Sequence, residues 1–168
     1  MTDDFRDVLL SFVNAGVRFL VVGAHALAAH GIPRTTGDLD LWVEPTEQNA
    51  ERVWTALSNF GAPLDALGVK RDDFCRVDVI AQFGLPPYRI DVMTGISGVS
   101  FESAWHDRFD GEMLGIPVAF LGRASFLQNK RASGRSKDLR DIEALELLRV
   151  QELVGRRSAA SPITAQEC

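Results

Sequence analysis

The sequence predicts an α/β domain of the α+β kind, with a mixed β-sheet flanked by helices and a helical C-terminal part. Short apolar runs of strand length alternate with segments of helical period over roughly the first 120 residues. Two strand-like segments, residues 76–83 and 88–93, are joined by Gly84-Leu85-Pro86-Pro87, which predicts an antiparallel hairpin. From about residue 123 onward the apolar period is helical only. The 168 residues are enough for one ordinary domain.

The N-terminal third supplies the first two strands. A helix that ends at Gly16 is predicted from apolar residues at helical spacing: Phe5, Val8, Leu9, Phe12 and Val13. Residues 17–22 form a short valine-rich run before Gly23, which is typical of a buried strand. A small-residue helix at 24–30 and a turn at 32–37 follow. Residues 38–43 then alternate between acidic and apolar side chains, which predicts a strand with one polar face.

The remaining elements follow from the same periods. Helices are predicted at 46–60, 101–106, 124–132 and 138–150, and strands at 76–83, 88–93 and 116–121. We expect one domain over residues 1–154, with its helical C-terminal part from about 123. Residues 155–168 are small and polar, which predicts a disordered tail.

Composition excludes several classes of protein. With 46% hydrophobic and 24% charged residues, the chain has the balance of a soluble globular protein. Its longest apolar stretch, residues 19–32, contains two histidines and is too short to cross a bilayer. Asp3 and Asp4 stand where a secretory signal would carry basic residues. Two cysteines make no disulfide framework. We therefore expect a cytoplasmic protein with no membrane partner.

The charge is unevenly distributed along the chain. The net charge is −5, which is not typical of a protein that coats nucleic acid. Between Arg123 and Arg140, however, basic residues far outnumber the single acid, Asp138. This local excess of positive charge suits an anionic ligand.

Three acidic residues form the strongest functional signal. Asp38 and Asp40 are two apart on a predicted strand, so both side chains project from the same face. Asp91 lies in a second apolar strand segment, Arg89-Ile90-Asp91-Val92-Met93. If the two strands pair, the three carboxylates converge, and at about 4 Å each pair would repel by roughly 4 kcal/mol. Hard oxygen ligands without a histidine or cysteine cluster suit Mg²⁺, or Mn²⁺ in its place.

Such a cluster can hold two metal ions for phosphoryl transfer. Two alternatives remain open from the residues alone. An Asp-x-Asp pair at a strand edge can be solvated surface, and Asp78, in Val77-Asp78-Val79, competes with Asp91 for the third position.

The ordered motifs resemble a known family. Three segments are similar to the nucleotidyltransferase superfamily of DNA polymerase beta: Val21-Val22-Gly23-Ala24-His25-Ala26-Leu27, Arg34-Thr35-Thr36-Gly37-Asp38-Leu39-Asp40-Leu41 and Arg89-Ile90-Asp91. More narrowly, they resemble the small bacterial branch of abortive-infection toxin-type nucleotidyltransferases. The similarity extends over about residues 17–149 and includes Asn129-Lys130-Arg131.

The resemblance implies roles for these residues. Asp38 and Asp40 would bind both metal ions, and Asp91 would bind the catalytic ion and help to deprotonate the acceptor hydroxyl. Gly23 would let the backbone approach the phosphates of an NTP substrate. The family usually has Gly-Ser or Gly-Gly where this chain has Gly23-Ala24, so the hydroxyl that contacts a phosphate is missing.

Other residues could take over that phosphate contact. Thr35 and Thr36 carry hydroxyl groups close to the acidic strand. Arg34 could bind a phosphate or pair with an acid in its turn, and Lys130 is our candidate for the positive charge that a triphosphate needs. The nucleotide-binding set is therefore Gly23, Ala24, Arg34, Thr35, Thr36 and Lys130.

The sequence leaves the acceptor and the partner open. We expect transfer of an NMP to a hydroxyl of an RNA end such as tRNA, a protein side chain or a small molecule. The resemblance adds a role as the toxin of a toxin–antitoxin pair, with a cognate antitoxin as partner. Two alternatives compete: a non-catalytic nucleotide- or partner-binding module that keeps the fold, and a two-metal phosphodiester hydrolase that uses the same acids.

Overall fold

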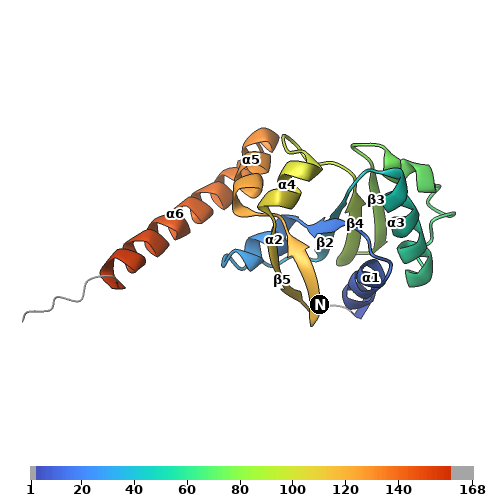
Figure 1. The fold of residues 1–168 in the computed structure, drawn as a ribbon, viewed down its shortest axis with the longest axis horizontal. Coiled ribbons are helices and arrows are strands. Elements are labelled where there is room, and N and C mark those ends of the chain that lie inside the picture. Colours follow the sequence, from blue (N-terminus) through green and yellow to red (C-terminus); the bar gives the residue numbers. More distant parts are fainter. Residues whose placement is uncertain (1–2, 160–168) are drawn as a thin grey trace, which may run out of the picture.

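The computed structural model describes residues 3–159. Helices and strands alternate up to residue 120, and two helices complete the described chain (Figure 1). The elements are α1 (Asp3–Asn14), β1 (Phe19–Val21), α2 (Gly23–Ala29), β2 (Asp38–Val43), α3 (Glu47–Phe60), the 3-10 helix η1 (Arg71–Cys75), β3 (Ile80–Leu85), β4 (Tyr88–Met93), α4 (Phe101–Asp107), β5 (Phe109–Met113), β6 (Ile116–Phe120), α5 (Arg123–Ser133) and α6 (Ser136–Ala159).

The six described strands form one mixed sheet in the order β3-β4-β2-β1-β6-β5. β4 runs parallel to β2, and β6 runs parallel to β1, whereas the β1–β2, β3–β4 and β5–β6 pairs are antiparallel. The predicted fold class, a mixed sheet flanked by helices, is therefore confirmed. The β3–β4 hairpin is also antiparallel as predicted, with its turn at Pro86-Pro87.

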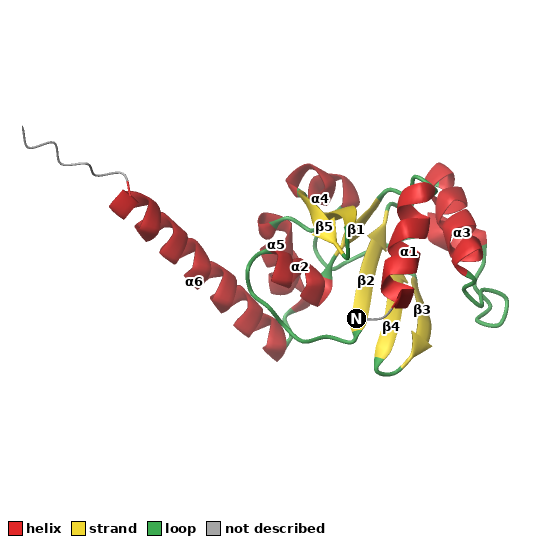
Figure 2. Ribbon diagram, turned by 90° about the horizontal axis from the view of Figure 1, so that it is seen from below, coloured by secondary structure: helices red, strands yellow, loops and turns green. Residues whose placement is uncertain are grey.

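Strand alternation separates a core face from a polar face in the middle of the sheet. On β2 and β4, the apolar side chains Leu39, Leu41, Ile90 and Val92 are buried, whereas the acidic residues between them are only half-buried. Helices α1 and α3 lie side by side near this part of the sheet (Figure 2). Their apolar faces contribute Phe5, Phe12, Val53 and Leu57 to the core.

Helix α3 shows how local sequence sets the element boundaries. The Thr46 hydroxyl accepts a hydrogen bond from the Asn49 backbone N–H and caps the first turn. Gly61 ends the helix in the left-handed conformation, with φ of 84°. The buried Asn49 amide bonds the backbone of Arg18 and Glu44. These bonds satisfy the polar atoms of the Asn49 side chain. They also join the residue before β1 to the residue after β2.

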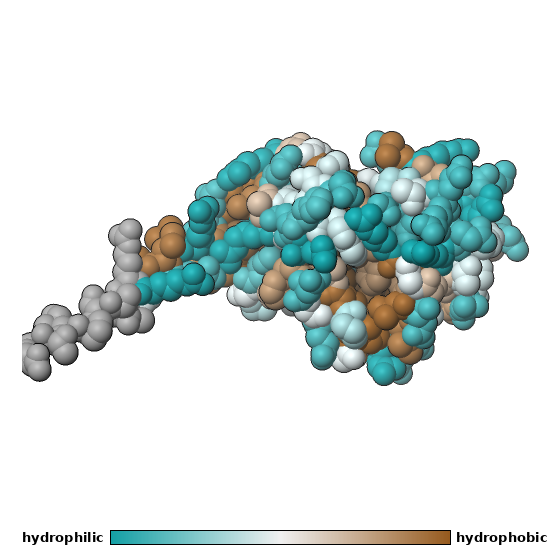
Figure 3. Space-filling model, viewed as in Figure 1, coloured by the Kyte–Doolittle hydropathy of each residue, from teal (hydrophilic) through white to brown (hydrophobic). Residues whose placement is uncertain are grey.

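Helix α6 projects away from the rest of the molecule (Figure 1). It continues to Ala159, so the helix extends past residue 154, where the sequence predicts the tail to begin, while residues 160–168 lie outside the described residues. Its outer part exposes apolar side chains among hydrophilic ones, including Leu147, Val150 and Leu153 (Figure 3). Between residues 3 and 159, no helix combines the length and apolar character needed to span a membrane.

Two predicted strands have different bounds in the structure, and one strand was not predicted. The strand predicted from residue 76 begins at Ile80, because Asp78 has a φ of 62°, which an extended strand does not allow. Strand β1 is shorter than the predicted 17–22. Strand β5 was not predicted, because it lies at a sheet edge with most of its side chains exposed, and only two of its residues, Phe109 and Met113, are large and apolar.

Candidate active site

Gly23 sits directly against Asp40. It connects β1 to α2 with a φ of 63°, in the left-handed region that favours glycine. A Cβ atom at this position would lie 2.1 Å from Oδ2 of Asp40, so any other residue would collide with that carboxylate. The backbone after β1 can approach the acidic strand this closely only because residue 23 has no side chain. Ala24 follows in the first turn of α2.

The β2–β4 pairing brings the acidic residues to one face. Asp40 is the partner of Asp91 in the parallel register, and Asp38 is the partner of Arg89. Paired residues project from the same side of a sheet, so all four side chains share the face opposite to the buried leucines. The pairing that the sequence analysis could only assume is therefore present.

The environment of Asp40 is unfavourable for a negative charge. Burial, which is the largest cause, and the neighbouring carboxylates of Asp91 and Asp38 together raise the pKa of the Asp40 carboxyl to about 6. The positive charges of Lys130 and Lys137 act in the opposite direction. Three carboxylates therefore interact electrostatically, and the central one keeps its proton up to about pH 6 when no cation is bound.

Two side chains that the sequence analysis gave no role contact this cluster. The Arg89 guanidinium forms an ion pair with Asp38, with Nε 3.1 Å from Oδ1. The Gln82 side-chain amide donates to Oδ1 of Asp91 at 2.8 Å. Both residues occupy alternate positions on the same face of β3 and β4, so strand period alone could have identified them.

The carboxylates do not yet surround one point. Asp38 is directed to Arg89 and Asp91 to Gln82, and among residues 3–159 no three acidic, histidine or cysteine side chains converge as a ready metal site. The chemistry of the donors still fits Mg²⁺, because three carboxylates from neighbouring strands share one face. The Asp38 side chain would have to leave Arg89 for all three to reach the same cation.

Asp78 lies apart from the cluster. It is exposed, it precedes β3, and its side chain is adjacent to Gly95, beyond the end of β4. The paired residues Asp38 and Arg89 lie at the N-terminal end of β4, which is the opposite end. Asp78 also does not contribute to the raised pKa of Asp40. Of the two candidates for the third carboxylate, the geometry therefore brings Asp91, and not Asp78, next to Asp40.

The predicted nucleotide-binding residues in the turn before β2 have different environments. The Thr36 hydroxyl accepts from the backbone N–H of Asp38 at 3.1 Å and so stabilises the start of the strand. Thr35 is exposed. Arg34 points to α6, where Nη1 lies 2.9 Å from both carboxylate oxygens of Asp141. Of these three side chains, Arg34 is already held in an ion pair.

Lys130 is also paired. Its Nζ lies 2.9 Å from Asp138 and 3.2 Å from Asp141, both on the first turns of α6. Lys137 is near enough to lower the pKa of Asp40, and no described carboxylate lies within ion-pair distance of its side chain. Lys137 is therefore a positive charge beside the cluster that the sequence analysis did not place there.

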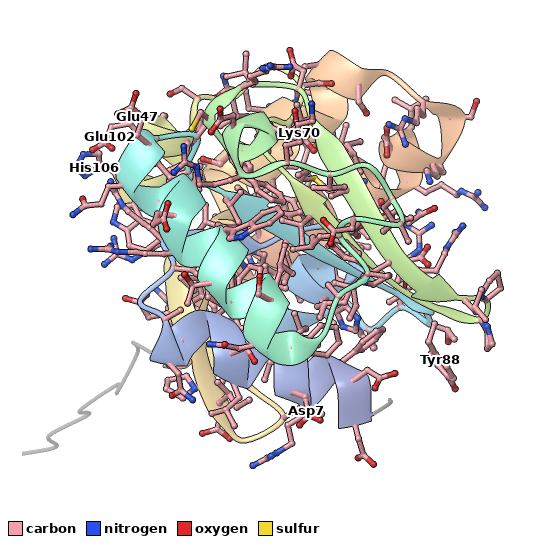
Figure 4. All side chains as sticks on the ribbon, turned by 90° about the vertical axis from the view of Figure 1, so that its right-hand side faces the viewer. Asp7, Glu47, Lys70, Tyr88, Glu102 and His106 are labelled. Atoms are coloured by element: carbon pink, nitrogen blue, oxygen red, sulfur yellow. The ribbon has the colours of Figure 1, made fainter. Side chains whose placement is uncertain are left out.

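A separate groove lies on the other side of the sheet. It has a volume of about 530 Å³ and is formed by α1, the end of α3 and the β3–β4 hairpin. Its lining includes Phe5, Phe83 and Ile90, which belong to the core face, and Asp7 and Tyr88 lie at its edge on the same side of the molecule (Figure 4). This groove is distinct from the acidic face.

Comparison with solved structures identifies the architecture. The crystal structure of a Thermotoga maritima protein, described as a "putative nucleotidyltransferase", aligns with a TM-score of 0.51 over 88% of this chain and 89% of that one. The chain has a nucleotidyltransferase-like fold. The two sequences are 15% identical, so the similarity concerns the nucleotidyltransferase-like fold alone. No protein-family model and no curated protein sequence matches the chain.

Proposed function

We propose that the protein is a metal-dependent nucleotidyltransferase that moves an NMP from an NTP to a hydroxyl acceptor. The observation that carries the proposal is the contact of Gly23 with Asp40, whose charge is opposed by Asp91 and Asp38 on the same face. Carboxylates that repel one another in a partly buried site need a cation. Because Gly23 has no side chain, the backbone at the start of α2 lies against these carboxylates, where its N–H groups would bind a phosphate of the nucleotide. The nucleotidyltransferase-like fold is consistent with this chemistry.

Asp38, Asp40 and Asp91 would hold Mg²⁺ or Mn²⁺. The chemistry supplied by the bound ions would be activation of the acceptor hydroxyl and stabilisation of charge on the pyrophosphate leaving group. Asp91 would take the proton of the acceptor hydroxyl. The acceptor oxygen then bonds to the α-phosphorus, while the bond from that phosphorus to pyrophosphate breaks. Release of Asp38 from Arg89 would also leave the guanidinium free beside the site.

The triphosphate would be bound by backbone at Gly23 and by nearby positive charges. Ala24 offers no hydroxyl, and Thr36 already bonds the start of β2. Lys137 is the cation near Asp40 without a carboxylate partner in the described chain. Arg34 and Lys130 would contribute once their acidic partners are displaced.

The acceptor and the biological role belong to the same proposal. Arg123, Lys130 and Arg131 are ion-paired within the chain. Arg135, Lys137 and Arg140 have no carboxylate within ion-pair distance in the described residues, and these three charges favour an anionic acceptor such as a tRNA end over a protein side chain or a neutral small molecule. The proposal also includes a role as the toxin of a toxin–antitoxin pair, with an antitoxin as partner. It includes a cytoplasmic location as well. The toxin role and its partner rest on the sequence motifs, and the location rests on the composition of the chain.

Labelled NTPs test the proposal. The protein is incubated with cell extract, Mg²⁺ or Mn²⁺, and each NTP labelled at either the α- or the γ-phosphate. We expect an acceptor to take up the α-label but not the γ-label, and EDTA to prevent it. Uptake of the γ-label would indicate a kinase, and release of nucleoside monophosphates from nucleic acid without NTP would indicate the phosphodiester hydrolase. Absence of labelling with every NTP would reject transferase activity.

A second candidate, a non-catalytic nucleotide- or partner-binding module, is favoured by two observations. Arg34 and Lys130 are neutralised by Asp138 and Asp141, and Ala24 lacks the phosphate-binding hydroxyl. A ligand at about 100 times its dissociation constant adds roughly 2.7 kcal/mol to the free energy of unfolding. If an NTP raises the melting temperature equally in EDTA and in Asp38→Asn, binding does not use the metal site, and this second function is supported.

A further inference from the structure

Four charged side chains form a connected network of ion pairs beside the candidate site. Arg34 comes from the loop before β2, Lys130 from α5, and Asp138 and Asp141 from α6. Arg34 lies 2.9 Å from Asp141, and Lys130 lies 2.9 Å from Asp138 and 3.2 Å from Asp141. Two positive and two negative charges give the network no net charge. The two cations chosen from the sequence as phosphate contacts are thus balanced within the protein.

The two acids differ in how firmly they are held. Asp138 also accepts hydrogen bonds from the Ser133 hydroxyl and the Arg135 backbone N–H, and these join the end of α5 to the start of α6. Burial opposes its negative charge, but the bonds from Ser133 and Lys130 outweigh burial and keep the pKa of Asp138 below its usual range. Within residues 3–159, the Asp141 carboxylate has only the side-chain cations of Arg34 and Lys130 as partners. Asp138 is therefore a structural link, whereas Asp141 is tied to the two cations alone.

Loss of the Asp141 charge would not leave either cation buried without a partner or water. Lys130 is only 15% exposed, but it keeps Asp138 as a partner. Arg34 is 39% exposed and can be hydrated. Lys130 is also close enough to Asp40 to influence that carboxyl electrostatically. An anion that reaches the acidic face from this side would therefore meet two cations with one exchangeable counterion.

We propose that Asp141 is an internal counterion that a bound polyphosphate displaces from Arg34 and Lys130. This inference rests on the proposed function, because it assigns the polyphosphate to the same site. In the absence of ligand, Asp141 holds both cations in place and neutralises them. On binding, phosphate oxygens replace the Asp141 carboxylate as their acceptor. Asp141 thereby limits the affinity of the site for triphosphate, and it acts through Arg34 and Lys130 as a positioning residue and not as a catalytic one.

The test is calorimetric binding of inorganic tripolyphosphate to the full chain in EDTA. Asp141→Asn removes the negative charge and keeps an amide that can still bond Arg34. We expect the dissociation constant for tripolyphosphate to fall about fivefold, because the variant removes one negative charge close to a hydrated anion. Adding Arg34→Gln to Asp141→Asn should return the dissociation constant to about the wild-type value.

Glu146→Gln is the matched control. Glu146 lies further along α6 and pairs with Arg131 at 2.6 Å, with both side chains more than half exposed, so the variant changes the net charge equally. We expect its dissociation constant for tripolyphosphate to equal that of the wild type. An equal gain in Glu146→Gln, or unchanged or weaker binding by Asp141→Asn, would overturn the inference.

Arg34→Gln in the otherwise native chain gives an independent result if Asp141→Asn does not fold. It removes a cation and leaves the Lys130–Asp138 pair, so we expect weaker tripolyphosphate binding; equal or tighter binding would contradict the inference. These measurements involve no transfer reaction. Failure of the labelling experiment with normal tripolyphosphate binding would therefore reject the proposed function and leave the role of Asp141 standing.

Discussion

Asp40→Asn is expected to abolish nucleotide transfer and to stabilise the metal-free protein above pH 6. The amide cannot serve as an anionic metal ligand, and we expect the rate of NMP transfer to fall more than about 100-fold. The same change removes a charge that burial, Asp91 and Asp38 all oppose. A residue that benefits function and costs stability is typical of a catalytic cluster.

The pH dependence of this stabilisation follows from the raised pKa. Asp40 titrates near 3.8 in the unfolded chain and at about 6 in the folded one. The folded state therefore binds more protons between these values, and stability falls as the pH rises through this window. Above pH 6 the cost reaches at most about 3 kcal/mol. Asp40→Asn should therefore match the wild type below pH 4 and exceed it above pH 6.

Urea unfolding in EDTA across this pH range measures the difference. Asp65→Asn is a suitable control, because Asp65 is an exposed acid in the loop after α3. We expect it to transfer NMP normally and to show no comparable gain in unfolding free energy at high pH. If Asp40→Asn is no more stable than the wild type at pH 7.5, the carboxylates do not repel one another as described.

Gly23→Ala should have the second large effect, on both the site and stability. Its Cβ would lie 2.1 Å from Oδ2 of Asp40, and its φ of 63° is unfavourable for alanine. Either the β1–α2 turn or the Asp40 carboxylate has to move. A misplacement of about 1 Å in a catalytic group can reduce the rate about 100-fold. We expect a loss of this order in the transfer assay, with weaker Mg²⁺ binding.

Gly16→Ala separates the contact from the backbone strain. Gly16 has a nearly equal φ of 66°, and nothing lies within 4 Å of the position of its added Cβ. Both variants should lose stability through the left-handed conformation, by about 1 kcal/mol or more. Only Gly23→Ala should also lose transfer. Equal loss of transfer in both variants would show that strain, and not the contact with Asp40, is responsible.

The elements with a clear period could be predicted from the sequence, and the others could not. The acidic strand at residues 38–43 has the predicted bounds because apolar and acidic side chains alternate along it. Strand β5 was missed because it pairs with β6 through its backbone at the sheet edge. The turn between β5 and β6 is also difficult to predict, because Leu114, at a φ of 56°, is not a typical turn residue.

Some features of the candidate site could likewise be predicted from the sequence, and others could not. The shared face of Asp38 and Asp40 follows from residue spacing, whereas their proximity to Asp91 depends on β2–β4 pairing between distant segments. Spacing also could not show that Arg34 faces Asp141, because Asp141 lies 107 positions after Arg34 in the chain. Long-range charge pairing is a property of the tertiary fold, and a local pattern does not contain it.

Transfer of the α-label by Asp91→Asn and Asp78→Asn tests the central claim most directly. Both variants remove one carboxylate, but only Asp91 is paired with Asp40. Asp78 is exposed and lies against Gly95, beyond the C-terminal end of β4. We predict that Asp78→Asn transfers NMP at the wild-type rate with Mg²⁺ or Mn²⁺, while Asp91→Asn falls to less than about 1% of it. Wild-type transfer by Asp91→Asn, or equal losses in both variants, would contradict a catalytic site built on Asp38, Asp40 and Asp91.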